Sequence, residues 1–439
     1  MAGDYFELRA RGTNVRTEVV AGVTTFLTMS YIIFVQPEML SEAGMDKTAL
    51  IAVTCITSGL VTLVTGLVAN APIAMAPGMG MNAFFAYSIV LGEGVSWETA
   101  LGAVFLSGVI FLLLTLVGLR KRLVEAIPPS LISSISVGIG LFITFMGLVN
   151  LGVVVNNEKT LVSAGKVTPT VLIGLAGLLV MLFLEIRKIK GALLIGIVFS
   201  TVLAAALGYV PKPAGYMSLD IDISAVAFKL DIVGALKWSL FSAIFTLAFI
   251  DMFDSVGTLV VCCHQAKMVD REGRIKALDR LLAIDAIATS VGAVFGTSNV
   301  NSYIESAAGI EQGGRSGVTS VVTGVCFFAA LLFVPVVGIV PNYATAPALI
   351  MVGLFMMKEI RGIDFTNMQE AFPAFIIIIM IALSYSISTG LAFGFISFVL
   401  IKSASGSIRE VKPMMWIIAA LSLLFLSADK LGDLIKCIK

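Results

Sequence analysis

Two acidic side chains in one apolar stretch are the first candidates for chemistry. Asp251 and Asp254 lie three residues apart in residues 237–261, with no Lys or Arg beyond the first residue of that stretch, and on a helix they share one face. A charge inside a membrane costs at least about 2.5 kcal/mol, so both should face the protein interior, where at least one can carry a proton part of the time. The alternative is a structural role, with the carboxylates bonded to hydroxyls such as Ser255 and Thr258.

A third acid, Glu305, lies in the second of two segments that interrupt the apolar pattern. The first, residues 76–85, places Pro77 and two glycines close to Asn82, and the second, residues 296–309, is rich in Ser, Thr and Asn. A broken helix frees backbone groups that can face a cavity. We therefore expect two extended strands that cross at the membrane centre, each continuing into a half-helix. Ordinary membrane helices that use these residues for packing are the alternative.

Other polar residues carry weaker signals. Asp285 lies near a basic loop, so a packing role is an equal alternative, and Glu18 suits the N-terminus of its own helix. The five cysteines and one histidine lack the spacing of a zinc site, a haem site or a disulfide framework, so no metal or other cofactor is expected. A run of hydroxyls in the first apolar stretch either lines a cavity or bonds to its own helix backbone: Thr24, Thr25, Thr28, Ser30 and Tyr31.

Composition places these residues in a membrane protein. The chain of 439 residues is 58% hydrophobic and only 13% charged, against about 25% charged residues in soluble domains. The net charge of +1 offers no basic surplus for nucleic acid.

Apolar stretches of the length that crosses a bilayer as helix recur along the chain. We expect an all-α polytopic bundle of fourteen spans, with residues 413–426 as a further segment that either crosses or lies at the interface. The expected spans are 17–36, 48–68, 72–90, 97–119, 130–152, 169–185, 190–209, 236–258, 281–296, 299–312, 316–338, 343–357, 370–386 and 389–402.

The distribution of charge predicts the orientation. With a cytoplasmic N-terminus, the basic clusters at residues 120–122, 187–190, 267–280, 358–361 and 402–412 fall on the cytoplasmic side, as the positive-inside rule requires. No small-residue cleavage site follows the polar start of the chain, so the first span should be retained. We expect a multi-pass protein of the plasma membrane.

The two halves of the chain resemble one another. Residues 129–132 and 137–142 are similar to residues 347–350 and 352–355. Seven spans per half is an odd number, so the second copy would be inverted, as in many secondary transporters. Chance similarity between short apolar strings is the alternative.

A cavity lined by these groups would suit a flat, neutral heteroaromatic ligand. Rings stack on aromatic side chains, carboxylates accept ring and exocyclic N–H donors, and backbone N–H groups donate to carbonyl or ring-nitrogen acceptors. A nucleobase has this pattern, an anion would be repelled, and amino acids and small amines remain open. The expected aromatics are Phe84, Phe85, Phe253 and Tyr303.

Three motifs carry a family resemblance. Residues 76–85, 249–259 and 296–310 together resemble the AzgA-like adenine/guanine/hypoxanthine permease branch of the nucleobase:cation symporter-2 (xanthine/uracil permease) family. The resemblance runs in order from about Tyr5 to the carboxyl end.

The resemblance implies the uracil-permease fold, with fourteen segments in two inverted sets of seven and short strands in segments 3 and 10. A core domain would comprise residues 1–120 and 237–340. A gate domain would comprise residues 121–236 and 341–412, and residues 413–439 would form an apolar segment and tail.

The resemblance also implies site residues. The eighth-segment acid is Asp254, the tenth-segment acid is Glu305, and the third-segment strand contributes residues 81–84. Expected substrate contacts are Asp254, Glu305, Asn82, Ala83, Phe84, Ile304 and Thr28. The coupled proton is expected on Asp254, Asp251 or Glu305.

The implied activity is import of a purine base (adenine, guanine or hypoxanthine) by proton symport, with sodium as the other coupling ion to consider. Expected partners are the purine, membrane lipids and a second copy in a homodimer. An anion exchanger of the sulfate-permease type shares the fold but should lack an acid at Glu305. An intramembrane aspartyl protease, the one enzyme considered, needs Tyr-Asp and Gly-x-Gly-Asp strings, and neither occurs.

Overall fold

The computed structural model describes residues 5–117, 127–211, 215–218, 221–237, 240–269, 275 and 277–438, apart from the side chains of Phe253, Phe425 and residues 428–438. Helices make up most of it. The membrane-length and shorter helices are α2 (Val15–Met29), α3 (Ile32–Glu42), α4 (Lys47–Val64), α5 (Met79–Ala83), α6 (Trp97–Leu116), α8 (Pro129–Leu151), α9 (Pro169–Ile186), α10 (Ala192–Ala206), α11 (Ile232–Ala235), α12 (Phe241–Gln265), α13 (Leu278–Phe295), α14 (Ser306–Glu311), α15 (Gly317–Ala330), α16 (Val334–Gly338), α17 (Asn342–Met356), α18 (Met368–Ser384), α19 (Ile387–Ala404) and α20 (Pro413–Ile438).

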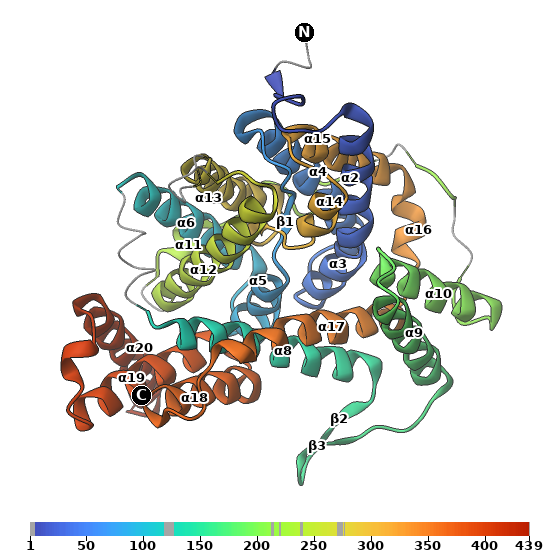
Figure 1. Ribbon diagram of the computed structural model, residues 1–439. Helices are drawn as coiled ribbons and strands as arrows, with labels where there is room; N and C mark the ends of the chain where they lie inside the picture. Colours follow the sequence, from blue (N-terminus) through green and yellow to red (C-terminus); the bar gives the residue numbers. More distant parts are fainter. Residues whose placement is uncertain are drawn as a thin grey trace.

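Strands and tighter or wider turns complete the described chain. The strands are β1 (Met75–Pro77), β2 (Val154–Asn157), β3 (Leu161–Ala164) and β4 (Val300–Ser302), and the π- and 3₁₀-helical turns are η1 (Thr65–Ala69), η2 (Phe84–Gly92), η4 (Leu331–Phe333), η5 (Met357–Gly362) and η6 (Ile408–Glu410). The hairpin of β2 and β3 projects from one end of the molecule (Figure 1).

Many helices have the length and composition of membrane spans. Within the described residues, nine helical stretches are long and apolar enough to cross a bilayer, and each coincides with a predicted span. They are Val15–Glu42, Lys47–Ala69, Trp97–Leu116, Pro129–Leu151, Pro169–Ile186, Phe241–Gln265, Gly317–Gly338, Asn342–Gly362 and Ile387–Ala404, and the shorter apolar helices are Met79–Gly92, Ala192–Ala206, Met368–Ser384 and Pro413–Leu424. The chain is therefore a helical polytopic membrane protein. The basic cluster at residues 120–122 lies outside the described residues.

Helices distant in sequence pack together. Helix α8 packs on α17 and α18, and α19 packs on α18 and α20, which gives the lower group of helices in Figure 1. Above them, α15 packs on α2 and α4, and α6 packs on α12 and α13. Strands β1 and β4 lie within this upper group.

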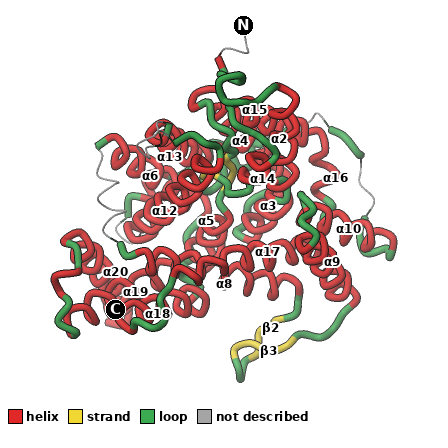
Figure 2. Tube along the Cα trace, viewed as in Figure 1, coloured by secondary structure: helices red, strands yellow, loops and turns green. Residues whose placement is uncertain are grey.

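Two short strands cross inside the bundle, as the sequence predicts. Strand β1 pairs antiparallel with β4, with Ala76 opposite Asn301 and Pro77 opposite Val300; the pair is yellow near the centre of Figure 2. Every residue of both strands is buried. Pro77 favours extended chain at the residue before it, and the ladder satisfies backbone groups that lipid cannot satisfy.

The strand in the first broken segment lies earlier than expected. Residues 81–84 were expected in a strand, but Met79–Ala83 form α5 and Phe84 opens the π-helical turn η2. Asn82 donates its backbone N–H to the carbonyl of Gly78 at 2.8 Å. Pro77 is still paired with Val300 in the strand ladder and Gly78 is the extended N-cap, so the helix begins at Met79.

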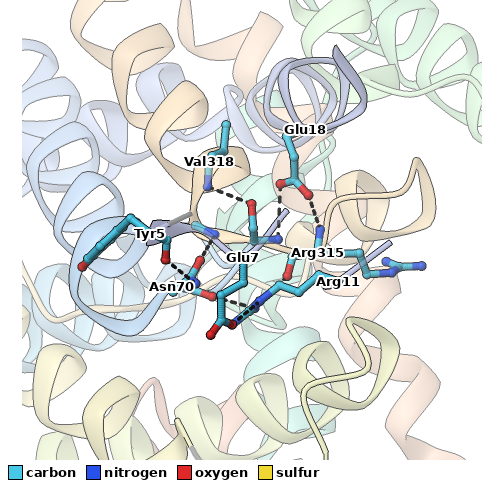
Figure 3. A network of polar contacts seen from close by, with 9 residues as sticks. Tyr5, Glu7, Arg11, Glu18, Asn70, Arg315 and Val318 are labelled. Atoms are coloured by element: carbon cyan, nitrogen blue, oxygen red, sulfur yellow. Dashed lines mark hydrogen bonds and ion pairs between the residues drawn. The ribbon is translucent and has the colours of Figure 1, made fainter. Parts of the chain in front are cut away.

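Glu18 does not serve its own helix. The side chain is fully buried and receives the backbone N–H groups of Arg315 at 2.9 Å and of Ser316 and Thr319 at 3.2 Å, as well as the Thr319 hydroxyl at 2.6 Å. Asn14 caps α2 instead. Figure 3 shows Glu18 reaching from α2 to Arg315. Glu18 therefore joins α2 to the N-terminus of α15, where a negative charge is stabilised.

We predict that Glu18→Gln lowers the free energy of unfolding by about 2 to 3 kcal/mol, because charge-assisted hydrogen bonds are lost and a donor N–H₂ then faces N–H donors. Thermal unfolding of the purified protein in detergent measures the change. Glu158→Gln, at an exposed position, is the control and should change the midpoint little. Equal midpoints for the two variants would contradict the capping role.

Candidate functional site

The first component of the site is Asp254 on α12. Its carboxylate accepts a hydrogen bond from Asn301 Nδ2 at 2.5 Å, and Asn301 belongs to the buried strand β4. Although it lies in the middle of a membrane-length helix, Asp254 is exposed. Space is open around Gly257 as well, where an added Cβ would meet nothing within 4 Å. Asp254 therefore borders open space beside the crossed strands.

The second component is Glu305, which directly precedes α14. Tyr31 donates its hydroxyl to Glu305 Oε1 at 2.7 Å, and the side chain is half-buried. The preceding residue, Ile304, is 48% exposed. Glu305 and Asp254 are near enough to interact electrostatically. The two acids from separate helices are thus held by a phenol and an amide, both neutral donors.

Packing against α2 positions Glu305. A Cβ on Gly309 would lie 2.1 Å from Thr25 Oγ1 and 2.5 Å from the Ala21 carbonyl oxygen, so only glycine allows α14 to approach so closely. The hydroxyl of Thr28 lies 3.5 Å from the backbone oxygen of Glu305, and it also donates to its own helix at Thr25 at 2.8 Å. Thr28 thus bonds to its own helix backbone, which was one of the two alternatives, and its contact with substrate stays a prediction.

The strands bring these components together. Tyr303 donates its hydroxyl to the Pro77 carbonyl at 2.5 Å, and its backbone N–H donates to the Ala74 carbonyl at 3.0 Å. Gly78 N–H donates to the Asn299 carbonyl at 3.0 Å. These bonds connect the start of α5 to the segment that carries Asn301 and Glu305.

Asp251 has different surroundings from Asp254. It is fully buried and accepts hydrogen bonds from Thr289 Oγ1 at 2.9 Å and Asn299 Nδ2 at 3.2 Å. Asp285, also fully buried, accepts the hydroxyl of Ser255. Asp251 and Asp285 thus lie in the packed interior behind the strands.

The expected third-segment contacts are not on an open surface. Asn82, Ala83 and Phe84 are fully buried, and the side-chain oxygen of Asn82 accepts the Ser298 hydroxyl. Phe85 is also fully buried, and Tyr303 is 5% exposed. The side chain of Phe253 lies outside the described residues. Among the aromatics named from the sequence, Tyr303 contacts the crossed strands directly.

Sequence reasoning missed two direct partners of the acids. The sequence singled out Tyr31 only as one member of a run of hydroxyls, and Asn301 only as one of several polar residues in its motif. The signal that could have found Tyr31 is its position in the same helical region as Thr28. No spacing rule pairs it with a residue 274 positions away.

The chain matches a known protein family over most of its length. The Xan_ur_permease model, described as the permease family, matches residues 16–393. The chain belongs to this family. It is 41% identical to adenine permease AdeP of Escherichia coli K12, over 95% of this chain and 94% of that protein. It is 40% identical to guanine/hypoxanthine permease PbuO of Bacillus subtilis 168, over 95% of this chain and 98% of that protein.

These relatives confirm the AzgA-like branch that the motifs predict. Among solved structures, the permease is similar to the transmembrane domain of the cyanobacterial bicarbonate transporter BicA, with a TM-score of 0.63 and 15% sequence identity. The match covers 85% of this chain and 97% of that one. At this identity the likeness shows the fold alone.

The exposure of the site gives a test of water access. In a cysteine-free variant, Ile304→Cys should react with a charged, membrane-impermeant thiol reagent, because the side chain of Ile304 is 48% exposed and directly precedes Glu305. Ala83→Cys, fully buried, should not react. Leu179→Cys on α9, 65% exposed on a membrane-length helix, controls for exposure to lipid and should also stay unmodified. Equal labelling of positions 304 and 179 would contradict a water-filled site.

Proposed function

We propose that this permease imports purine nucleobases (adenine, guanine or hypoxanthine) by proton symport. The observation that carries the proposal is the pair of carboxylates, Asp254 in α12 and Glu305 directly before α14, which are both accessible and lie close enough to interact electrostatically. The names of the relatives AdeP and PbuO support purines as the substrate class. Binding here needs no metal or other cofactor.

The chemistry of the two acids suits a base. A carboxylate accepts two parallel N–H donors, and the N1–H and 2-amino edge of guanine supplies such a pair. Hypoxanthine supplies one of these donors, and adenine presents a different edge. Tyr31 and Asn301 hold the acids without neutralising them, so each carboxylate keeps its accepting capacity for the ligand.

A proton is the favoured coupling ion because Asp254, Glu305 and Asp251 can each carry one. Asp254 and Glu305 reach the open space and can exchange protons with water there. Asp251 lies behind them, bonded to Thr289 and Asn299, and is the third candidate carrier. Sodium is the alternative ion.

Alternating access would follow the family's arrangement of fourteen segments in two inverted sets of seven. The core, residues 1–120 and 237–340, would carry the base past the gate, residues 121–236 and 341–412. Several hydrogen bonds join these parts at the end predicted to face outside, among them Asn150 Nδ2 to Glu42 Oε1 at 2.8 Å, Ser88 Oγ to the Tyr385 carbonyl at 2.6 Å and Ser388 Oγ to Thr246 Oγ1 at 2.9 Å. Their release is an expected part of opening to the outside.

Orientation and assembly complete the proposal. The permease would reside in the plasma membrane with its N-terminus in the cytoplasm, as the positive-inside rule predicts, and would form a homodimer. Anion exchange is the rival, since BicA shares the fold. Two carboxylates beside the open space would repel an anion, which favours a neutral base.

Uptake of labelled bases tests the proposal. In cells lacking their own purine carriers, the permease should accumulate adenine, guanine or hypoxanthine, faster at lower external pH, and should not accumulate uracil or bicarbonate. Lack of purine accumulation, with the protein present in the membrane, would defeat the proposal.

We predict that Glu305→Gln and Asp254→Asn each lower the initial rate of purine uptake about 10- to 100-fold, because a charged acceptor contributes about 1.5 to 3 kcal/mol to a hydrogen bond. Glu359→Gln, at an exposed carboxylate of η5, is the control and should transport normally. Normal uptake by the Glu305→Gln variant would remove that residue from the site.

A further inference from the structure

A second cavity lies at the end of the molecule where the N-terminal segment packs. It has a volume of about 770 Å³, within the usual range for small-molecule sites. Its described lining includes Tyr5, Glu7, Arg11, Lys267, Arg280 and Arg315. Neither Asp254 nor Glu305 belongs to the described lining, so this cavity is separate from the proposed transport site.

Positive charge dominates the described lining of the cavity. Arg11, Lys267, Arg280 and Arg315 line it, against the single carboxylate of Glu7. Glu7 lies 3.3 Å from Arg11 Nε in an ion pair, which leaves the other cations uncompensated by the described lining. An anion would therefore be attracted to this cavity.

Backbone carbonyls orient two of the cations. Arg11 Nη1 donates to the carbonyls of Asn70 at 3.0 Å and Arg315 at 2.9 Å. Arg315 Nη1 donates to the carbonyls of Ile310 at 2.7 Å and Gly314 at 2.8 Å. Figure 3 shows Arg11 beside Asn70, Glu7 and Arg315. These bonds fix both guanidinium groups at the wall of the cavity before any ligand arrives.

The other two cations are free of this framework and are exposed. Lys267 follows the end of α12, and Arg280 lies in the first turn of α13. Guanidinium groups bind phosphate oxygens through paired N–H donors, and an ammonium adds a mobile point charge. Tyr5, 60% exposed and bonded through its hydroxyl to the Leu67 carbonyl, offers a ring face for stacking.

We infer that this cavity binds an organic phosphate. The exposed ring of Tyr5 and a volume large enough for a nucleotide favour a purine nucleoside monophosphate as its source over the phosphate of a lipid headgroup. The recognised chemistry is the same in both cases: a phosphate ester held by Lys267 and Arg280, with the fixed guanidinium groups adding positive charge at the wall of the cavity.

The cavity also touches both elements that carry the site acids. Lys267 lies at the end of α12, which carries Asp254, and Arg315 bonds the carbonyl of Ile310 in α14, which begins directly after Glu305. The effect of the phosphate on transport rests on the proposed function. A phosphate that bridges the N-terminal segment, α12 and α13 would favour one arrangement of these elements, and such differential binding slows exchange between states. Occupancy should therefore lower the rate of purine transport.

Binding of radiolabelled GMP to the purified full-length permease in detergent tests the inference without any transport assay. We expect saturable binding that excess inorganic phosphate competes away and that weakens as ionic strength rises. The Lys267→Gln/Arg280→Gln double variant should bind at least about 10-fold more weakly, the loss of about 1.4 kcal/mol. Arg361→Gln, at an exposed basic position on η5, is the control and should bind as the parent does.

Competition by lipid vesicles distinguishes a nucleotide from a lipid headgroup as the source of the phosphate. If phosphatidylglycerol vesicles displace or replace GMP with the same sensitivity to the double variant, the phosphate site stands and the lipid is its source. Both single variants, checked by thermal unfolding, guard against a misfolded double variant. Absence of saturable binding by GMP, phosphate and lipid, or binding unchanged in the folded variants, would overturn the inference.

A transport readout separates this inference from the proposed function. GMP on the cytoplasmic face of inside-out vesicles should lower purine flux several-fold, and the double variant should resist it. GMP binding without purine flux would sink the proposed function and leave the phosphate site intact. Purine flux without GMP binding would overturn the phosphate site and leave the proposed function intact.

Discussion

The need to satisfy backbone polar groups away from water is the constraint on which the rest of the permease depends. Two segments leave the helical pattern inside the bundle, and lipid offers their N–H and C=O groups no partners. They solve this by pairing with each other, β1 with β4, and by the bonds of Gly78 and Tyr303 to the opposite segment. This pairing fixes where α5 and α14 begin, and with them Glu305 and the strand residue Asn301.

A second feature of the structure concerns the negative charge of the site acids. Asp254 and Glu305 receive hydrogen bonds from an amide and a phenol, and neither donor carries a charge that would cancel the carboxylate. Glu18, by contrast, is surrounded by four donors from the start of α15 and is committed to structure. Burial and partner type thus separate acids that look alike in sequence.

Much of this arrangement could be predicted from the sequence, because hydropathy determines where helices cross and Pro77 and the polar run around Asn301 break them. The location of the broken segments and the acids followed from those local signals. The start of α5 did not, since the exact end of a three-residue strand depends on its partner. The roles of Glu18 and Tyr31 depend on residues about 300 and 274 positions away, and no local pattern encodes such contacts.

The most direct test of the central claim is an experimental structure of the permease with guanine bound. We expect the base beside the crossed strands, with Glu305 accepting its N1–H and 2-amino groups and with Asp254 on the same cavity. A base bound elsewhere, with the two carboxylates directed away from each other, would contradict the account.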